Sequence, residues 1–293
     1  MAKNNRVQPK QDGVIFFTRP WKVFVIEILL FLIIFVLGIS TSMKINQILE
    51  IRKIRMPQAS FWRFVYHFLI VTLLVFLIIR LIKFKKQKRI IFKILFVFTV
   101  FWGGILLLSV WIPDLIAVIA MSVLVFWWWR WPSVFIQDVC VVLGIVGISS
   151  LLGLSFNPET VIFFLIVFSI YDVIAVYKTK HMIEIAKEMI SSKAILALVV
   201  PSNASGLREG LEGIMVRGKF LILGGGDIAF PLLLCCSMVP FGLLKSVIVA
   251  LFSLIGLSAS FWIFILQKKQ KPIPALPPVA LLSILGYLFA GLF

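Results

Sequence analysis

Long apolar runs, separated by short stretches of charged or turn-forming residues, limit most strongly what this chain can fold into. A helix needs about 20 residues to cross the hydrocarbon core of a membrane, and about nine runs in the sequence approach that length. They lie near 22–40, 62–82, 91–111, 114–129, 134–153, 160–178, 219–240, 244–266 and 275–292. These runs predict an all-α fold: a polytopic membrane bundle of about nine transmembrane helices.

The overall composition agrees with a membrane environment. Of the 293 residues, 61% are hydrophobic and 14% are charged, whereas soluble domains carry about 25% charged residues. A chain this apolar lacks the polar residues needed to cover a surface in water. We therefore expect an integral protein of the cell membrane, surrounded by the lipid bilayer.

The positive charges predict how the chain is oriented. The formal net charge is +17, and Lys and Arg gather in short stretches between the apolar runs. Cytoplasmic loops are enriched in these residues, and the basic stretches expected on the side of the N-terminus are 3–22, 83–89, 178–193 and 268–271. One stretch, 44–55, is basic on the opposite side, but the sum predicts a cytoplasmic N-terminus and a C-terminus outside. With no nucleic-acid-binding motif in the sequence, this distribution also argues against a nucleic-acid partner.

Three carboxylates lie well inside the predicted spans: Glu27, Asp172 and Asp227. An Asp at the centre of a membrane helix costs about 2.5–3.5 kcal/mol on insertion scales, so such a residue usually has a function. Asp172 precedes Lys178 by about 9 Å of helix, and Asp227 follows Lys219 by about 12 Å. In antiparallel neighbouring helices these two carboxylates would reach nearly the same depth. Glu27, one turn inside the first span, is interpreted as a helix-end carboxylate or structural partner.

Two carboxylates at one depth are suited to two kinds of chemistry. Close together in a low-dielectric site they cannot both ionise easily, so one holds a proton. The ionised partner can then take a proton from water while the other donates to a peptide carbonyl oxygen, which hydrolyses the bond without a covalent intermediate. Transporters also bury acids as proton relays or ion-coupling sites, and the acids alone favour a transporter somewhat.

The residues around the acids carry a family resemblance. Three motifs in three predicted spans are Tyr171-Asp172, Gly224-Gly225-Gly226-Asp227 and Pro274-Ala275-Leu276. They resemble the presenilin and signal-peptide-peptidase family of intramembrane aspartyl proteases, which carries Tyr-Asp in its sixth helix, Gly-x-Gly-Asp in its seventh and Pro-Ala-Leu at the start of its ninth. The stretch 171–182 is especially similar to prokaryotic presenilin homologues. The resemblance covers the chain from about residue 160 onward.

This resemblance implies an aspartic endopeptidase with a presenilin-like fold, in which Asp172 and Asp227 form the catalytic pair. The remaining residues of the active-site motifs would be Tyr171, Gly224, Gly226, Pro274, Ala275 and Leu276. Single-span transmembrane proteins would be the substrates, and no cofactor, metal or obligate accessory subunit is inferred. The chain would divide into a cytoplasmic N-terminal tail, 1–21, transmembrane helices one to five, 22–153, and catalytic helices six to nine, 154–293, with a cytoplasmic loop at 181–218.

Two alternatives stay open. One is an ion- or proton-coupled transporter, and the other is a prepilin-peptidase-like aspartyl protease, because Gly-x-Gly-Asp also occurs in prepilin peptidases. The Tyr-Asp and Pro-Ala-Leu motifs disfavour the second. A zinc protease is disfavoured because the sequence has no His-Glu-x-x-His, and a serine hydrolase because it has no Gly-x-Ser-x-Gly.

Two stretches of the predicted loop have patterns of their own. Residues 182–190 alternate apolar and charged side chains at helical spacing, which predicts a helix on the membrane surface. Residues 214–221 are rich in strand formers. A substrate helix must unwind before water can attack it, and its freed backbone groups then need partners. Our hypothesis is that 214–221 and Pro274-Ala275-Leu276 supply strand-like edges that capture the unwound substrate.

Overall fold

The protein is a bundle of apolar helices with one small sheet. The computed structural model describes residues 20–54, 60, 62–63, 65–67, 69–70, 73–74, 77, 85–178, 188–201, 204–211, 220–267 and 272–292. The α-helices are α1 (Pro20–Arg52), α3 (Lys85–Leu108), α4 (Asp114–Arg130), α5 (Val134–Ser155), α6 (Pro158–Val173), α8 (Gly225–Met238), α9 (Leu243–Ile265) and α10 (Leu276–Ala290). Shorter elements are the π-helix η1 (Ile174–Lys178), the 3-10 helices η2 (Ala204–Arg208) and η4 (Val239–Phe241), and the strands β1 (Ala197–Pro201) and β2 (Phe220–Gly224).

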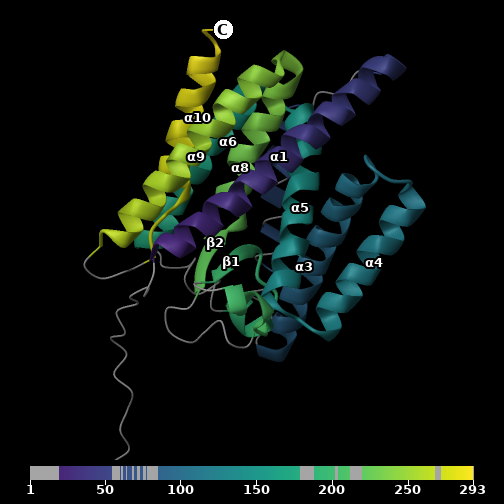
Figure 1. Ribbon diagram of the computed structural model, residues 1–293, viewed down its shortest axis with the longest axis vertical. Helices are drawn as coiled ribbons and strands as arrows, with labels where there is room; N and C mark the ends of the chain where they lie inside the picture. Colours follow the sequence, from purple (N-terminus) through teal and green to yellow (C-terminus); the bar gives the residue numbers. More distant parts are fainter. Residues whose placement is uncertain are drawn as a thin grey trace, which may run out of the picture.

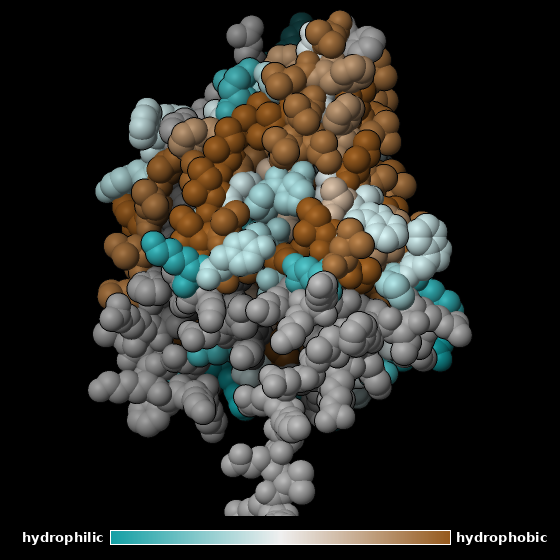
Figure 2. Space-filling model, turned by 90° about the vertical axis from the view of Figure 1, so that its left-hand side faces the viewer, coloured by the Kyte–Doolittle hydropathy of each residue, from teal (hydrophilic) through white to brown (hydrophobic). Residues whose placement is uncertain are grey.

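The prediction of a helical membrane bundle is confirmed. Five helices among the described residues are long and apolar enough to cross a membrane, and the segments Gly225–Phe241 and Leu276–Ala290 are shorter apolar helices. Apolar side chains cover the upper part of the face drawn in Figure 2, with more hydrophilic residues in a band below them. Every described residue between 62 and 77 is helical. The count of nine spans stays a prediction.

Helix α5 is the centre of the packing. It contacts α1, α3 and α8, whereas α9 and α10 form a closely packed pair on one side of the bundle (Figure 1). Small residues allow α3 and α5 to approach: a Cβ added at Gly147 would collide with the carbonyl oxygen of Gly103. Close contact through small residues is the usual way in which helices associate in lipid, where apolar burial alone gives little driving force.

The seventh predicted span, 219–240, differs from expectation in its first residues. It begins as strand β2, which pairs antiparallel with β1, and becomes helical only at Gly225. The register joins Ala197 to Gly224 and Val199 to Ile222. The sheet lies near the end of the bundle at which α1 begins, whereas α10 ends at the opposite end (Figure 1).

The loop before β2 is only partly described. Residues 188–192 are helical, and 182–187 of the predicted surface helix lie outside the described residues. Of the stretch 214–221, residues 220 and 221 belong to strand β2, and 214–219 lie outside the described residues. The capture of substrate by this stretch stays a prediction. The described part packs on the α4–α5 turn, because the Val134 amide donates to the Glu209 carbonyl at 3.1 Å.

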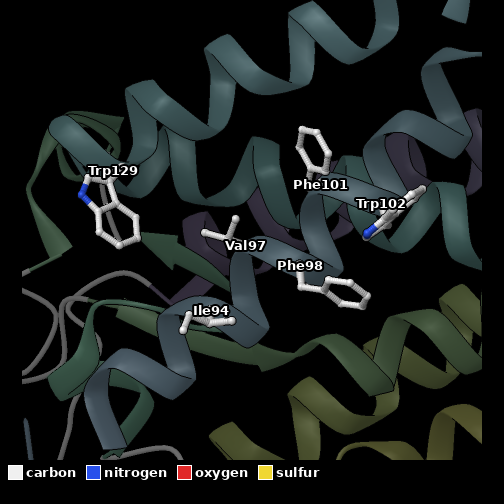
Figure 3. Close-up of a pocket in the computed structure, with 6 residues that line it drawn as sticks. All are labelled: Ile94, Val97, Phe98, Phe101, Trp102 and Trp129. Carbon is white, nitrogen blue, oxygen red and sulfur yellow. The ribbon is translucent and has the colours of Figure 1, made fainter. Parts of the chain in front are cut away.

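An apolar groove lies on another part of the molecule. One face of α3, with Trp129 of α4, lines it through Ile94, Val97, Phe98, Phe101, Trp102 and Trp129 (Figure 3). Four of these side chains are more than half exposed, which suits a surface that faces acyl chains. Neither Asp172 nor Asp227 is among the residues that line this groove.

Candidate active site

Asp172 lies near the end of α6 and is only 6% exposed. The α-helix ends one residue later, and the π-helix η1 follows it. Short π-helical segments are frequent at functional sites because they alter the direction of nearby side chains. The Oδ2 atom of Asp172 accepts a hydrogen bond from the Leu276 amide at 3.3 Å. This bond ties α6 to the start of α10.

Asp227 lies in the first turn of α8 and is only 7% exposed. Its carboxyl accepts a hydrogen bond from the backbone amide of Gly224, the last residue of β2. A Cβ at Gly224 would lie 2.8 Å from the Oδ2 of Asp227. The absence of a side chain at 224 therefore lets the backbone approach the carboxyl closely.

The structure brings the two aspartates together. Asp172 and Asp227 are close enough for their charges to repel each other, and α6 packs directly against α8. The depth estimate from the sequence expected this proximity. Two adjacent buried carboxyls share a proton, since both cannot carry charge in a low-dielectric site.

The glycines before Asp227 differ in how tightly they are enclosed. A Cβ at Gly225 would lie 2.8 Å from the carbonyl oxygen of Leu196, and the Gly225 amide donates to that same oxygen at 3.2 Å. A Cβ at Gly226 would make only ordinary contact, 3.7 Å from the Phe230 ring. The motif assignment of Gly224 and Gly226 left out Gly225, yet Gly225 has the contact to the sheet.

The Pro-Ala-Leu segment borders Asp172. Pro274 and Leu276 are buried, and the Leu276 amide makes the hydrogen bond to Asp172. The hydroxyl of Ser260 on α9 donates to the carbonyl of Ala275 at 3.0 Å, which holds the irregular backbone ahead of α10. Tyr171, by contrast, is 58% exposed although it is adjacent to Asp172 in sequence.

Sequence reasoning missed part of the surroundings of the pair. Glu27 is 3% exposed and interacts electrostatically with Asp227. One of its carboxyl oxygens has no hydrogen-bond partner in the part of the chain that the structure describes. Asp138 also lies inside a helix, α5, and is buried, so it is a fourth acid within the bundle. The predicted fifth span, 134–153, placed Asp138 near its beginning, so this acid was not counted among those well inside a span. Strand β1 has a short, wholly apolar sequence that periodicity does not separate from helix.

The arrangement provides two interacting buried carboxyls, of which a low-dielectric site favours only one being charged. Non-helical backbone lies next to each of them: β2 before Asp227, and residues 272–275 before Leu276. That set suits general acid–base hydrolysis with water as the nucleophile. Among the described residues, no three or more His, Cys, Asp and Glu side chains are grouped as metal ligands would be.

The fold and this pair define a class: a helical membrane protein with two buried aspartates on neighbouring helices. Residues 28–293 match the family described as "Signal-peptide peptidase, presenilin aspartyl protease". The chain belongs to this family, and it is an intramembrane aspartyl protease that acts on transmembrane substrates within the bilayer.

Solved structures agree with the fold. Two structures of a presenilin family intramembrane aspartate protease, in C222 and P2 space groups, are each 21% identical to this chain. The first has a TM-score of 0.61 and covers 92% of this chain and 98% of its own; the second has 0.57, 90% and 96%. A comparison with curated proteins gave no match.

Proposed function

We propose that Asp172 and Asp227 are the catalytic pair that hydrolyses peptide bonds inside the membrane. The observation that carries this proposal is the proximity of the two side chains. The buried carboxyls, from α6 and α8, interact electrostatically, and each accepts a backbone hydrogen bond. Buried acids in lipid are costly, and a pair that shares a proton has the acid and the base that hydrolysis needs.

The proposed reaction begins with one aspartate ionised and the other protonated. The ionised carboxylate takes a proton from water as the water oxygen bonds to the scissile carbonyl carbon, and the protonated carboxyl donates to the carbonyl oxygen. In the second step a carboxyl gives its proton to the amide nitrogen, the carbon–nitrogen bond breaks, and one hydroxyl proton of the intermediate returns to the pair. The pair ends with the single proton with which it began.

We propose that the substrate binds along the outer edge of β2, the edge that faces away from β1. The Gly224 amide reaches Asp227, and successive outward amides along a strand are two residues apart. Ile222 and Phe220 therefore present their amides on the same edge as Gly224. An unwound substrate segment that paired there would satisfy its backbone groups and lie beside Asp227.

The orientation and the domain boundaries are also proposals. The basic stretches support a cytoplasmic N-terminus and a C-terminus outside the cell membrane. In Figure 1, α1 begins and α10 ends toward opposite ends of the bundle, which supports the same orientation. In that orientation the preferred substrates are single-span proteins with their N-terminus outside. Residues 22–153 would form the supporting helices and 154–293 the catalytic part, without obligate accessory subunits.

The test uses the purified protein in liposomes with a membrane-spanning test peptide. Wild type should release two fragments, and Asp227→Ala and Asp172→Ala should release neither while still reconstituting as folded protein. Proton or sodium flux through the liposomes, retained without cleavage, would instead support the transporter alternative. Cleavage at the wild-type rate by either variant would remove that residue from the mechanism.

A further inference from the structure

We infer that Asp138 of α5 is a positioning residue: it closes the outer edge of β1, so that a substrate strand can join the sheet only at β2, in one register beside Asp227. This inference rests on the proposed function and adds the element that fixes where the substrate is cut. Nothing in the two acids themselves determines that position, because a bare carboxyl pair could meet any peptide bond that reaches it.

The contact that carries the inference is a buried hydrogen bond. The Oδ1 atom of Asp138 accepts from the backbone amide of Val199, in the middle of β1, at 2.8 Å. Asp138 is 4% exposed and Val199 is fully buried. The second oxygen, Oδ2, has no hydrogen-bond partner among the described residues, so the bond to Val199 is the contact that the described structure gives this carboxyl.

The direction of the Val199 amide shows which edge Asp138 occupies. An amide that donates to α5 cannot also donate to β2, so Val199 and Ile222 form a non-hydrogen-bonded pair of the antiparallel ladder. The hydrogen-bonded pairs of the ladder are then every second pair, those of residues 196, 198 and 200 of the β1 side. The Gly225 amide donates to the Leu196 carbonyl, which agrees with this assignment. The Asp138 carboxyl therefore lies against the edge of β1 that faces away from β2.

A second side chain of α5 strengthens the same attachment. The side-chain amide of Gln137 donates to the Ile195 carbonyl, just before β1. Its oxygen accepts from the Trp128 indole of α4 at 2.6 Å, which fixes the orientation of the Gln137 amide. Two adjacent residues of α5 thus hold the chain at two points, 195 and 199.

The attachment extends from β1 to the catalytic turn. The Leu196 carbonyl, one residue from Ile195, accepts from Gly225, two residues before Asp227. Contacts from α5 to β1, from β1 to β2 and from β1 to the start of α8 therefore fix the position of the Asp227 carboxyl relative to α5. A substrate strand added at β2 takes its register from this sheet, and the bond that lies opposite Asp227 follows from that register.

Among the described residues β2 pairs only with β1, so its outer edge is unpaired, whereas Asp138 closes the outer edge of β1. Edge strands offer unpaired amide and carbonyl groups to any extended chain, and proteins commonly block the edges that should not pair. Pro201, at the same phase as Val199 in β1, has no amide to offer. At residue 199 the bond to Asp138 makes the amide unavailable to another strand, and at residue 201 the proline has no amide to donate.

The experiment compares the cleavage positions of a membrane-spanning test peptide, read by mass spectrometry of both fragments. Asp138→Ala frees the Val199 amide, so we expect cleavage spread over neighbouring bonds and a rate at least fivefold lower. Asp138→Asn keeps an acceptor oxygen and should restore the wild-type positions. Ser150→Ala is the matched control: it removes a buried hydrogen bond of α5 to Gly38, away from the sheet, and should cut at wild-type positions.

A double variant tests the edge directly. Combining Asp138→Ala with Val199→Pro removes both the acceptor carboxyl and the donor amide of this hydrogen bond. Proline at 199 has no amide to donate, so the outer edge of β1 stays closed without the carboxyl. We expect it to return the wild-type cleavage positions, and to bind a transition-state-analogue inhibitor even if Asp138→Ala alone has lost that binding. Unchanged cleavage positions in Asp138→Ala would overturn the inference, whatever the rate, as would a double variant that does not recover the wild-type positions.

The outcome is separate from that for the catalytic pair. Asp227→Asn tests the pair by loss of all cleavage, whereas the Asp138 variants are read by where the peptide is cut. Cleavage by Asp227→Asn would overturn the proposed function. Wild-type positions in Asp138→Ala, with an inactive Asp227→Asn, would overturn only the role of Asp138.

Discussion

The two aspartates reach the same site from regions that are built differently. Asp172 lies near the end of helix α6 and accepts its hydrogen bond from Leu276, 104 positions away in the chain. Asp227 begins a helix directly after a strand and takes its hydrogen bond from Gly224, three positions away. The Asp172 side is fixed by packing between helices, whereas the Asp227 side is fixed by a sheet that α5 holds in place.

This difference separates two tasks. Helices can hold a carboxyl at a set depth because their backbone bonds are satisfied internally. A strand leaves backbone groups free on its outer edge, and those groups can meet an unwound substrate. We therefore expect changes near Asp172 to affect the rate of hydrolysis, and changes near Asp227 to affect substrate binding and cleavage position as well.

The largest loss of cleavage should come from changing either aspartate of the pair, and the loss should be the same for both. Asp172→Asn and Asp227→Asn should each lower cleavage by at least about 1,000-fold, a loss of about 4 kcal/mol of transition-state stabilisation. The double variant should be no slower than either single one, because groups that act as a unit are not additive. Initial rates on a transmembrane peptide in liposomes measure this, and a double variant slower by the product of both losses would mean that the residues act independently.

The next largest losses of cleavage should distinguish the outer edge of β2 from the edge that pairs with β1. Ile222→Pro removes an outward amide only, so it should lower cleavage by about 100-fold or more while a small transition-state analogue still binds. Leu223→Pro removes an amide that pairs with β1 and should weaken inhibitor binding as well, because the sheet itself is damaged. Phe220→Pro should behave as Ile222→Pro does. Full activity of Ile222→Pro would remove the outer edge of β2 from substrate binding.

The glycines before Asp227 give a smaller and more local contrast. Gly225→Ala places a methyl group against the backbone oxygen of Leu196, so β1 must shift, and we expect a loss of about 10- to 100-fold in cleavage. Gly226→Ala meets only ordinary contacts and should keep cleavage within about threefold of wild type. Equal losses in the two variants would show that the strand contact at 225 has no special part.

The sequence predicted more of the Asp172 side than of the Asp227 side. Apolar runs of membrane length gave the helices, and two acids among them stood out because lipid penalises charge. The run 219–240 was read as one helix, since a strand of five apolar residues has no period that distinguishes it from a helical turn. Val199 and Asp138 are 61 positions apart, and contacts over such separations depend on the fold rather than on local pattern.

A modest effect is expected from the backbone that supports Asp172. Ser260→Ala removes the hydrogen bond to the Ala275 carbonyl, and a typical bond of this kind contributes about 1 kcal/mol. The Leu276 amide would hold Asp172 less firmly, so cleavage should fall by about two- to fivefold with unchanged cleavage positions. Ser258→Ala is the control, because its hydroxyl bonds to Leu254 of its own helix. Altered cleavage positions in Ser260→Ala would contradict the division of tasks between the two sides.

The smallest effect concerns Glu27, the third acid near the pair. Its carboxyl interacts with Asp227, yet one oxygen has no hydrogen-bond partner within the described ranges, and a buried polar group without partners usually destabilises a fold. Glu27→Gln keeps the shape and removes the charge, so cleavage should stay within about tenfold of wild type, a change of about 1.4 kcal/mol or less. Glu159→Gln, at an exposed position hydrogen-bonded to Tyr287, is the control for loss of a carboxylate. If Glu27→Gln is as inactive as Asp227→Asn, the site has three functional acids. The division into an Asp172 side and an Asp227 side would then be wrong, and the three acids would act as one cluster.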